Sequence, residues 1–161
     1  LFGCDTLVIG SGIKTGLKIL TNNPALLGAD LVVDAVAGIA EYGAPLIIID
    51  MGTATTISVI NGEGAYIGTV IMPGVTVSLN SLVSGTSQLP KISLEKPKTI
   101  IGTNTADCMK SGIMYGTAAS IDGMIDKIRR ELGADARAVA TGGVAPVIIP
   151  RCEREIPVDD E

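Results

Sequence analysis

The stretch at residues 46–60, LIIIDMGTATTISVI, constrains this chain more than any other part of the sequence. Its first half is a leucine and isoleucine run that ends in Asp50, and a second run rich in β-branched residues follows the glycine at position 52. Because β-branched residues favour strands and glycine favours turns, the stretch predicts two strands joined by a tight turn.

The turn of this hairpin carries the residues best suited to chemistry. Gly52 lets another group approach the backbone closely, and Thr53, Thr55 and Thr56 supply hydroxyl donors. Asp50 stands at the end of the first strand, where a hydrated cation could be held. The pattern suits a phosphate with its counter-ion, and it equally suits an ordinary hairpin whose polar side chains satisfy turn hydrogen bonds.

Composition limits the partners of the chain. Its 161 residues suit one domain, or one complete lobe with part of another, and a hydrophobic content of 47% is ample for a core. Aromatic residues make up only 2%, so there is little material for stacking bases or sugars. The net charge is −5 and the twelve basic residues form no cluster, which argues against nucleic acid as a partner.

Cysteine and histidine usage limits the chemistry. Cys4, Cys108 and Cys152 are widely spaced and histidine is absent, so neither a zinc site nor a disulfide framework is expected, and a reducing cytoplasm fits best. The apolar runs are short and broken, so no membrane span is expected, and the first residues lack a signal-peptide pattern. Without histidine, a general base near neutral pH must be a carboxylate, lysine, cysteine or tyrosine.

The first part of the chain predicts two short strands and a helix. The strands are expected at 6–9 and 14–20, and Asn23-Pro24 is typical of a helix start, with Gly43 as its end. Asp30, Asp34 and Glu41 follow one another at near-helical spacing and so share a stripe, which is either a solvated face or a catalytic one. A glycine at position 28 favours close approach by a ligand or another backbone.

The rest of the chain predicts an antiparallel meander followed by helices and strands. The expected elements are strands at 46–50, 53–60 and 65–72, a short helix at 75–83, a surface loop at 88–98, a long helix at 105–132, a strand at 138–141 with a glycine turn and a short helix after it, and a last strand at 155–158.

Taken in order, several fragments resemble the type III pantothenate kinase family. They are Gly12-Ile13-Lys14-Thr15-Gly16, Asn23-Pro24, Gly28-Ala29-Asp30, Asp50-Met51-Gly52-Thr53-Ala54-Thr55, Ile71-Met72-Pro73-Gly74, Gln88-Leu89-Pro90, Thr105, Ser111-Gly112-Ile113-Met114-Tyr115-Gly116 and Thr141-Gly142-Gly143. The resemblance implies an α/β fold, namely a ribonuclease H-like or actin-like ATPase lobe with a mixed sheet, an antiparallel three-strand meander and flanking helices. It divides the chain into residues 1–43, the end of a first lobe with a linking helix, and residues 44–161, a second actin-like lobe that is expected to be truncated at its C-terminal end.

The resemblance also implies an activity, which is ATP-dependent phosphorylation of pantothenate to 4'-phosphopantothenate, the first step of coenzyme A biosynthesis. Asp30 would be the proton acceptor and Asp50 the ligand of a monovalent cation, K⁺ or NH₄⁺, with Mg²⁺ accompanying ATP. The family further implies a cytoplasmic homodimer. The implied substrate-binding residues are Gly28, Ala29, Asp30, Leu31 and Thr105, with Thr105 presented near the partner subunit, and the implied ATP-binding residues are Gly52, Thr53, Thr55, Gly142 and Gly143.

Some family features are replaced or absent in this sequence. Leu31 stands where the family has arginine, Thr21 where an aromatic substrate contact usually precedes Asn-Pro, and Gly68-Thr69 where the family has a glycine pair. The N-terminal Asp-x-Gly-Asn-Thr phosphate loop of the family does not occur here, so we expect the chain to be part of a longer protein and to be weakly active or inactive alone. A non-catalytic regulatory or accessory relative is the alternative function.

Overall fold

The computed structural model describes residues 14–159, so the strand expected at 6–9 lies outside the described residues. In chain order the elements are β1 (Lys18–Ile19), the 3₁₀ turn η1 (Pro24–Leu26), α1 (Ala29–Tyr42), β2 (Leu46–Met51), β3 (Ala54–Ile60), β4 (Ala65–Pro73), α2 (Val75–Ser84), α3 (Thr105–Leu132), β5 (Arg137–Thr141), α4 (Ala145–Ile148) and η2 (Ile149–Arg151).

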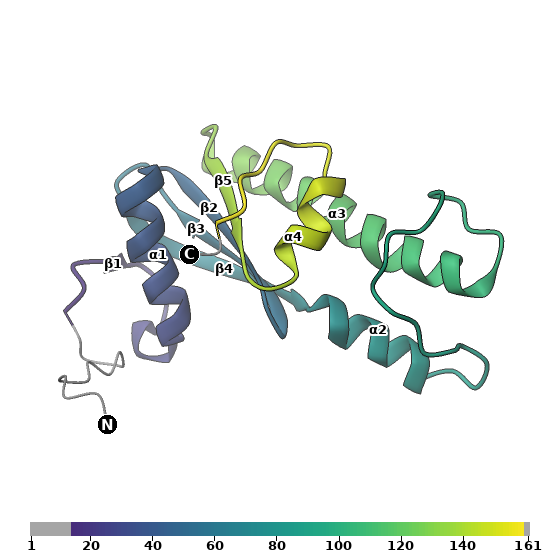
Figure 1. Ribbon diagram of the computed structural model, residues 1–161. Coiled ribbons are helices and arrows are strands. Elements are labelled where there is room, and N and C mark those ends of the chain that lie inside the picture. The colour runs from purple at the N-terminus through teal and green to yellow at the C-terminus, as the bar shows by residue number, and fades with distance from the viewer. Residues whose placement is uncertain (1–13, 160–161) are drawn as a thin grey trace, which may run out of the picture.

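The strands form one mixed five-stranded sheet in the order β1-β4-β3-β2-β5. The predicted meander is confirmed, because β2, β3 and β4 pair antiparallel with one another. β5 pairs parallel to β2, with Asp50 opposite Thr141, so the ends of these two strands lie at the same edge of the sheet. Figure 1 shows the sheet between α1 and the pair α3 and α4.

Each face of the sheet has its own core, because successive side chains of a strand point to opposite faces. Ile47, Ile49 and Met51 of β2 pack in the larger core with α2, α3 and α4. Leu46 and Ile48 pack on the other face with Ala35 of α1. The hairpin that anchors the sheet is therefore buried on both sides.

The predicted helix start at Asn23-Pro24 is wrong, because the α-helix begins at Ala29. These residues open only the 3₁₀ turn η1, because Leu27 is extended, with φ −69° and ψ 128°. The α-helix begins at Ala29 with Gly28 as its N-cap, so Gly28 precedes the helix and does not lie within it. Asp30 is therefore the second residue of α1 and lies in its first turn.

The strand predicted over 155–158 does not form as predicted, and only its Val158 pairs with the sheet. Instead of a strand over 155–158, one isolated parallel bridge joins Val158 to Ala140 of β5. Proline has no N–H to donate, and Pro157 contributes only its carbonyl, which accepts from the Ala140 N–H at 2.9 Å. The chain therefore touches the outer edge of β5 at one place.

The long helix predicted over 105–132 is confirmed as α3. The Asn104 side chain caps its N-terminus by accepting from the Asp107 N–H at 3.0 Å, and Gly133 ends it in the left-handed region at φ 63°. Figure 1 shows α2 and the N-terminal half of α3 projecting beyond the sheet, on the side away from α1. Among the described helices, none combines the length and the apolar character needed to cross a membrane.

Candidate functional site

Asp50 lies where the ends of β2 and β5 meet. The turn after β5 packs against it so closely that a Cβ atom added to Gly142 would stand 2.7 Å from Asp50 Oδ1 and 2.7 Å from the Met51 backbone nitrogen. Gly142 also has φ 95°, a backbone conformation that side chains disfavour. The parallel pairing of β2 with β5 therefore brings two separate fragments of the sequence, Asp50 and Gly142, into contact.

Helix α1 adds two more carboxylates to the same place. Asp30 lies in its first turn and Asp34 one turn later on the same side of the helix. Burial, followed by the negative charges of Asp50 and Asp30, raises the pKa of Asp34 to about 6. Burial and the charge of Asp30 likewise raise the pKa of Asp50. Asp34 also lines one pocket with Thr141, the residue paired with Asp50, so α1 brings these aspartates to the ends of β2 and β5.

The turn between β2 and β3 borders this carboxylate cluster. Gly52 and Thr53 are exposed, and the Gly52 N–H donates to the Ala54 carbonyl at 3.0 Å. A Cβ atom at Gly74, the N-cap of α2, would collide with the carbonyl oxygens of Thr53 and Gly52. The start of α2 therefore packs against one side of the turn, and Gly52 and Thr53 remain exposed to solvent.

Two hydroxyl groups next to the turn are buried without a hydrogen-bond partner among residues 14–159. They belong to Thr55, which is 1% exposed, and Thr56, which stands opposite Asp50 in the antiparallel pair. Buried hydroxyls are normally hydrogen-bonded, so each of these two groups lacks its usual partner among the described residues. Thr56 lies on the face of the sheet that carries Asp50, and Thr55 lies on the opposite face.

The remaining site residues predicted from the sequence fall into two groups. Gly28 lies at the cluster, because a Cβ atom there would collide with Asp30 Oδ1, and Ala29 follows it at the start of α1. Gly143 is exposed beside Gly142, with open space where its Cβ would lie. By contrast, Leu31 is only 8% exposed and offers no charge.

Thr105 is not brought to the cluster within this chain. It begins α3 at the end that projects beyond the sheet, whereas α1 covers the opposite end of the molecule (Figure 1). Any contact between Thr105 and a ligand at Asp30 must therefore come from another arrangement, such as a second subunit.

Asp34 is the residue whose importance the sequence understated. In the sequence it belongs to a stripe that suits either solvent or catalysis, whereas the structure turns it towards Asp50 and Asp30. It also lines a small pocket of about 190 Å³ between α1 and β5, together with Glu41, Thr141 and Asp159. The signal available in the sequence is its spacing, four residues after Asp30.

Comparison with known proteins identifies relatives of this chain. A family model of type III pantothenate kinases matches residues 1–127. A Baf family protein from Campylobacter jejuni has a similar fold, with a TM-score of 0.57 and 19% identity over 88% of this chain and 61% of that chain. The chain thus spans about three fifths of the length of that protein. The predicted mixed α/β fold, with its antiparallel three-strand meander and flanking helices, is confirmed.

Two further solved structures match with lower scores. The activator of the 2-hydroxyisocaproyl-CoA dehydratase from Clostridium difficile has a TM-score of 0.43 and 15% identity over 78% of this chain and 58% of that chain. The ethanolamine utilization protein EutJ from Carboxydothermus hydrogenoformans has a TM-score of 0.44 and 17% identity over 88% of this chain and 60% of that chain.

Proposed function

The chain belongs to the type III pantothenate kinase family, and we propose that it forms part of an enzyme that phosphorylates pantothenate with ATP. The observation that carries the proposal is the meeting of Asp30, Asp34 and Asp50 beside the glycine turns of β2–β3 and β5. In the reaction, the primary hydroxyl oxygen of pantothenate bonds to the γ-phosphorus of ATP while the bond to the bridging oxygen breaks and ADP leaves. The hydroxyl proton passes to the enzyme.

Asp30 is the proposed acceptor of that proton. It is exposed in the first turn of α1, so a substrate hydroxyl can reach it. Gly28 lies directly against its carboxylate, which leaves the approach free of a side chain. Phosphoryl transfer has a loose transition state and depends mainly on positioning and charge neutralisation, so one well-placed carboxylate suffices for the proton.

Asp50 is the proposed ligand of a monovalent cation, K⁺ or NH₄⁺. It is half-buried, and its pKa is raised by burial and by Asp30, so a cation beside it would relieve the repulsion among the aspartates. The unpartnered Thr56 hydroxyl opposite Asp50 is a further oxygen donor on the same face. One carboxylate with neutral oxygens suits a weakly charged ion, and the bound cation would neutralise phosphate charge.

The glycine turns are the proposed nucleotide contacts. Thr53 presents a hydroxyl donor at an exposed turn that Gly52 keeps free of a side chain, and the Thr55 hydroxyl is buried next to it. Gly142 packs the turn after β5 against Asp50, and Gly143 beside it has open space, so we propose these two glycines as the adenosine contacts. We propose that Mg²⁺ is carried by the ATP phosphates, where it would neutralise charge on the transferred group.

The proposal includes a second subunit and a cytoplasmic location. Thr105 lies far from the cluster of its own chain, so we propose that it contacts pantothenate in the site of the partner in a cytoplasmic homodimer.

A non-catalytic relative is the second candidate, and Leu31 is the observation that favours it. Leu31 is buried and uncharged at the position where the family has arginine, so the charged anchor that an arginine would offer the pantothenate carboxylate is missing. A regulatory protein would keep the nucleotide site and lose turnover.

The experiment that separates the two candidates uses the longer parent protein. We propose measuring ADP formation with ATP, Mg²⁺ and pantothenate, in potassium chloride and in sodium chloride at equal ionic strength, together with calorimetry of ATP and pantothenate binding. The kinase proposal expects pantothenate-dependent turnover that is faster in potassium. Nucleotide binding with no pantothenate-dependent heat or turnover would support the regulatory relative and refute the kinase.

A further inference from the structure

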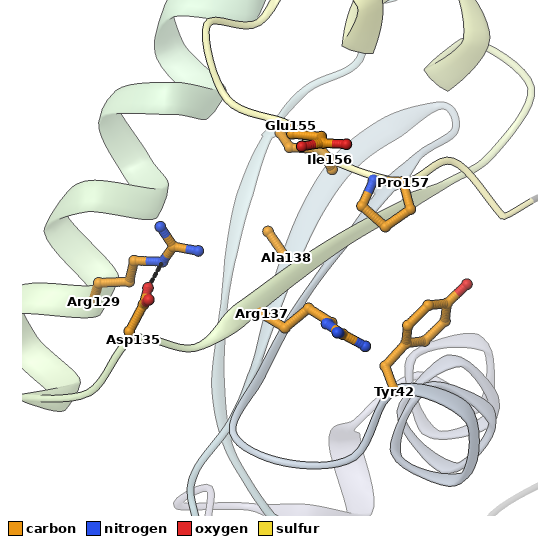
Figure 2. Close-up of a pocket in the computed structure, with 8 residues that line it drawn as sticks. All are labelled: Tyr42, Arg129, Asp135, Arg137, Ala138, Glu155, Ile156 and Pro157. Carbon is orange, nitrogen blue, oxygen red and sulfur yellow. Dashed lines mark ion pairs between the residues drawn. The ribbon is translucent and has the colours of Figure 1, made fainter.

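A second pocket lies at the other end of β5. Its volume is about 760 Å³, and Figure 2 shows its lining, which includes Tyr42, Arg129, Arg137, Ala138 and Glu155. Arg137 begins β5, whereas the carboxylate cluster lies beside Thr141 at its end. Four residues of strand separate the two places by about 13 Å, so the pocket is distinct from the proposed kinase site.

The pocket is bounded by backbone groups that the described part of the chain leaves unpaired. The Arg137 N–H donates to Pro45 on the β2 side, and Ala140 bonds outward to Pro157 and Asp159. Because alternate residues of a strand point their N–H and C=O groups in the same direction, those of Ala138 also point outward, away from β2. Ala138 is 5% exposed, and residues 14–159 supply no partner for either group.

The missing partner is the strand expected over 155–158. The segment reaches β5 only at the Val158 bridge, and Glu155, Ile156 and Pro157 instead form the opposite wall of the pocket. In Figure 2, Ala138 lies between this wall and Arg137. Buried backbone groups need a hydrogen-bond partner, so the space beside Ala138 suits a molecule that carries an amide.

The pocket around Ala138 is lined by charged side chains of both signs. The Arg137 guanidinium lies over the Tyr42 ring, 6.0 Å from its centroid, and forms no ion pair within residues 14–159. Glu155 is exposed and likewise has no ion pair among them. Arg129 is engaged differently, because its guanidinium donates to the Ala136 carbonyl and pairs with Asp135 at 3.2 Å. One cation and one anion therefore remain available to a ligand.

We propose that this pocket binds a small zwitterionic amide, chemically a di- or tripeptide. Its amide hydrogen-bonds to the backbone of Ala138, its carboxylate lies at Arg137, and its ammonium group lies at Glu155. The pocket is within the range of about 300 to 1,000 Å³ that is typical of small-molecule sites. The assignment does not depend on the proposed kinase activity, since none of these residues belongs to the carboxylate cluster.

A matched set of peptides tests the proposal on the full chain. The probes are trialanine with free ends, its N-acetylated form and its C-terminal amide, titrated while the backbone amide signals are followed by NMR. We expect saturable shifts centred on Ala138 with the free peptide. Each cap removes one charge, and an exposed or partly exposed ion pair contributes up to about 1 kcal/mol, so each cap should weaken binding by about threefold to fivefold.

Charge-neutral variants then assign the ends of the peptide. In Arg137→Gln the C-terminal amide should bind within twofold of the free peptide, and in Glu155→Gln the acetylated peptide should do so. Arg130→Gln is the matched control, because Arg130 is the exposed neighbour of Arg129 outside the pocket, and it should leave all three affinities unchanged. The proposal is overturned if free trialanine leaves the Ala138 signal unmoved, or if the capped peptides bind the unaltered chain as tightly as the free one.

Discussion

Gly142 packs directly against Asp50, although the two residues are 92 positions apart in the sequence (142 − 50). No side chain fits between them, because a Cβ atom at Gly142 would stand 2.7 Å from Asp50 Oδ1. The same Cβ would stand 2.8 Å from the Met51 carbonyl carbon. The glycine turn after β5 therefore packs directly against the Asp50 carboxylate.

Replacing Gly142 by alanine is therefore expected to disturb both stability and the site. The substitution combines a positive φ with contacts to the backbone of Met51, which cannot move away as a flexible side chain could. We expect a loss of about 2 kcal/mol or more in the free energy of unfolding. The matched control is Gly143→Ala, where nothing lies within 4 Å of the added atom and φ is not positive. Equal stabilities of the two variants in urea unfolding would contradict this description of the turn.

Replacing Gly28 by alanine should act mainly on activity, with only a small loss of stability because alanine is a poorer N-cap than glycine. The added Cβ would meet the Asp30 carboxylate, the far end of a flexible side chain that can rotate away. Because rotation would move the proposed proton acceptor, we expect turnover of the parent protein to fall by about tenfold or more, with a melting temperature close to that of the unaltered protein. Gly112→Ala, at an exposed position of α3 with open space, is the control that should retain full activity. Full activity in Gly28→Ala would show that the orientation of Asp30 is unimportant.

Asp34 should make the folded chain less stable as the pH rises. Its pKa is about 6 in the folded state, above the ordinary value of 3.8, so between these values the folded state holds more protons than the unfolded state. Stability is then lost as the pH rises from about 4 to about 6, and the loss is complete above that range. We expect Asp34→Asn to stabilise the ion-free chain at pH 8 by roughly 1 to 2 kcal/mol and to have little effect near pH 4.

The measurement is urea unfolding at both pH values in a buffer free of potassium and ammonium. Glu131→Gln, an equal charge change at an exposed position near the end of α3, should show no such difference between the two pH values. If the Asp34→Asn chain is equally or less stable than the unaltered chain at pH 8, then burial and the repulsion from Asp50 and Asp30 do not destabilise the charged form of Asp34.

Asp50 should determine the response to potassium. If its carboxylate holds the cation, then Asp50→Asn removes the charged ligand, and the rate of the parent protein should become equal in potassium and sodium chloride. The measurement is the ratio of the two rates at fixed ionic strength, which is independent of the amount of active enzyme. A variant that keeps the potassium preference of the unaltered protein would exclude Asp50 as the ligand.

Much of the fold follows from local patterns. The hairpin at 46–60 and the helix Thr105–Leu132 are found where residue periodicity and the flanking glycines predict them. The errors arise where tertiary contacts decide. Leu27 breaks the helix expected from Asn23-Pro24, and the segment before Val158 leaves β5 to form the wall of a pocket. The division of the chain at residue 43 stays a prediction.

The site was predictable only in part. Asp50 and Gly142 each follow a strand in the sequence, but only the parallel pairing of β2 with β5 shows that they touch. Asp34 appears in the sequence as one member of a stripe, and its closeness to Asp50 depends on how α1 lies on the sheet. Spacing places residues on one side of a helix, but it does not show what that side faces.

The most direct test of the central claim is the rate of pantothenate phosphorylation by the parent protein carrying Asp30→Asn. General base catalysis contributes about a hundredfold or more to a rate, so we expect a fall of at least about that size with ATP binding retained. Glu131→Gln, an equal charge change at an exposed position near the end of α3, should keep the original rate. An Asp30→Asn rate within a factor of about two of the unaltered protein would show that Asp30 does not accept the proton.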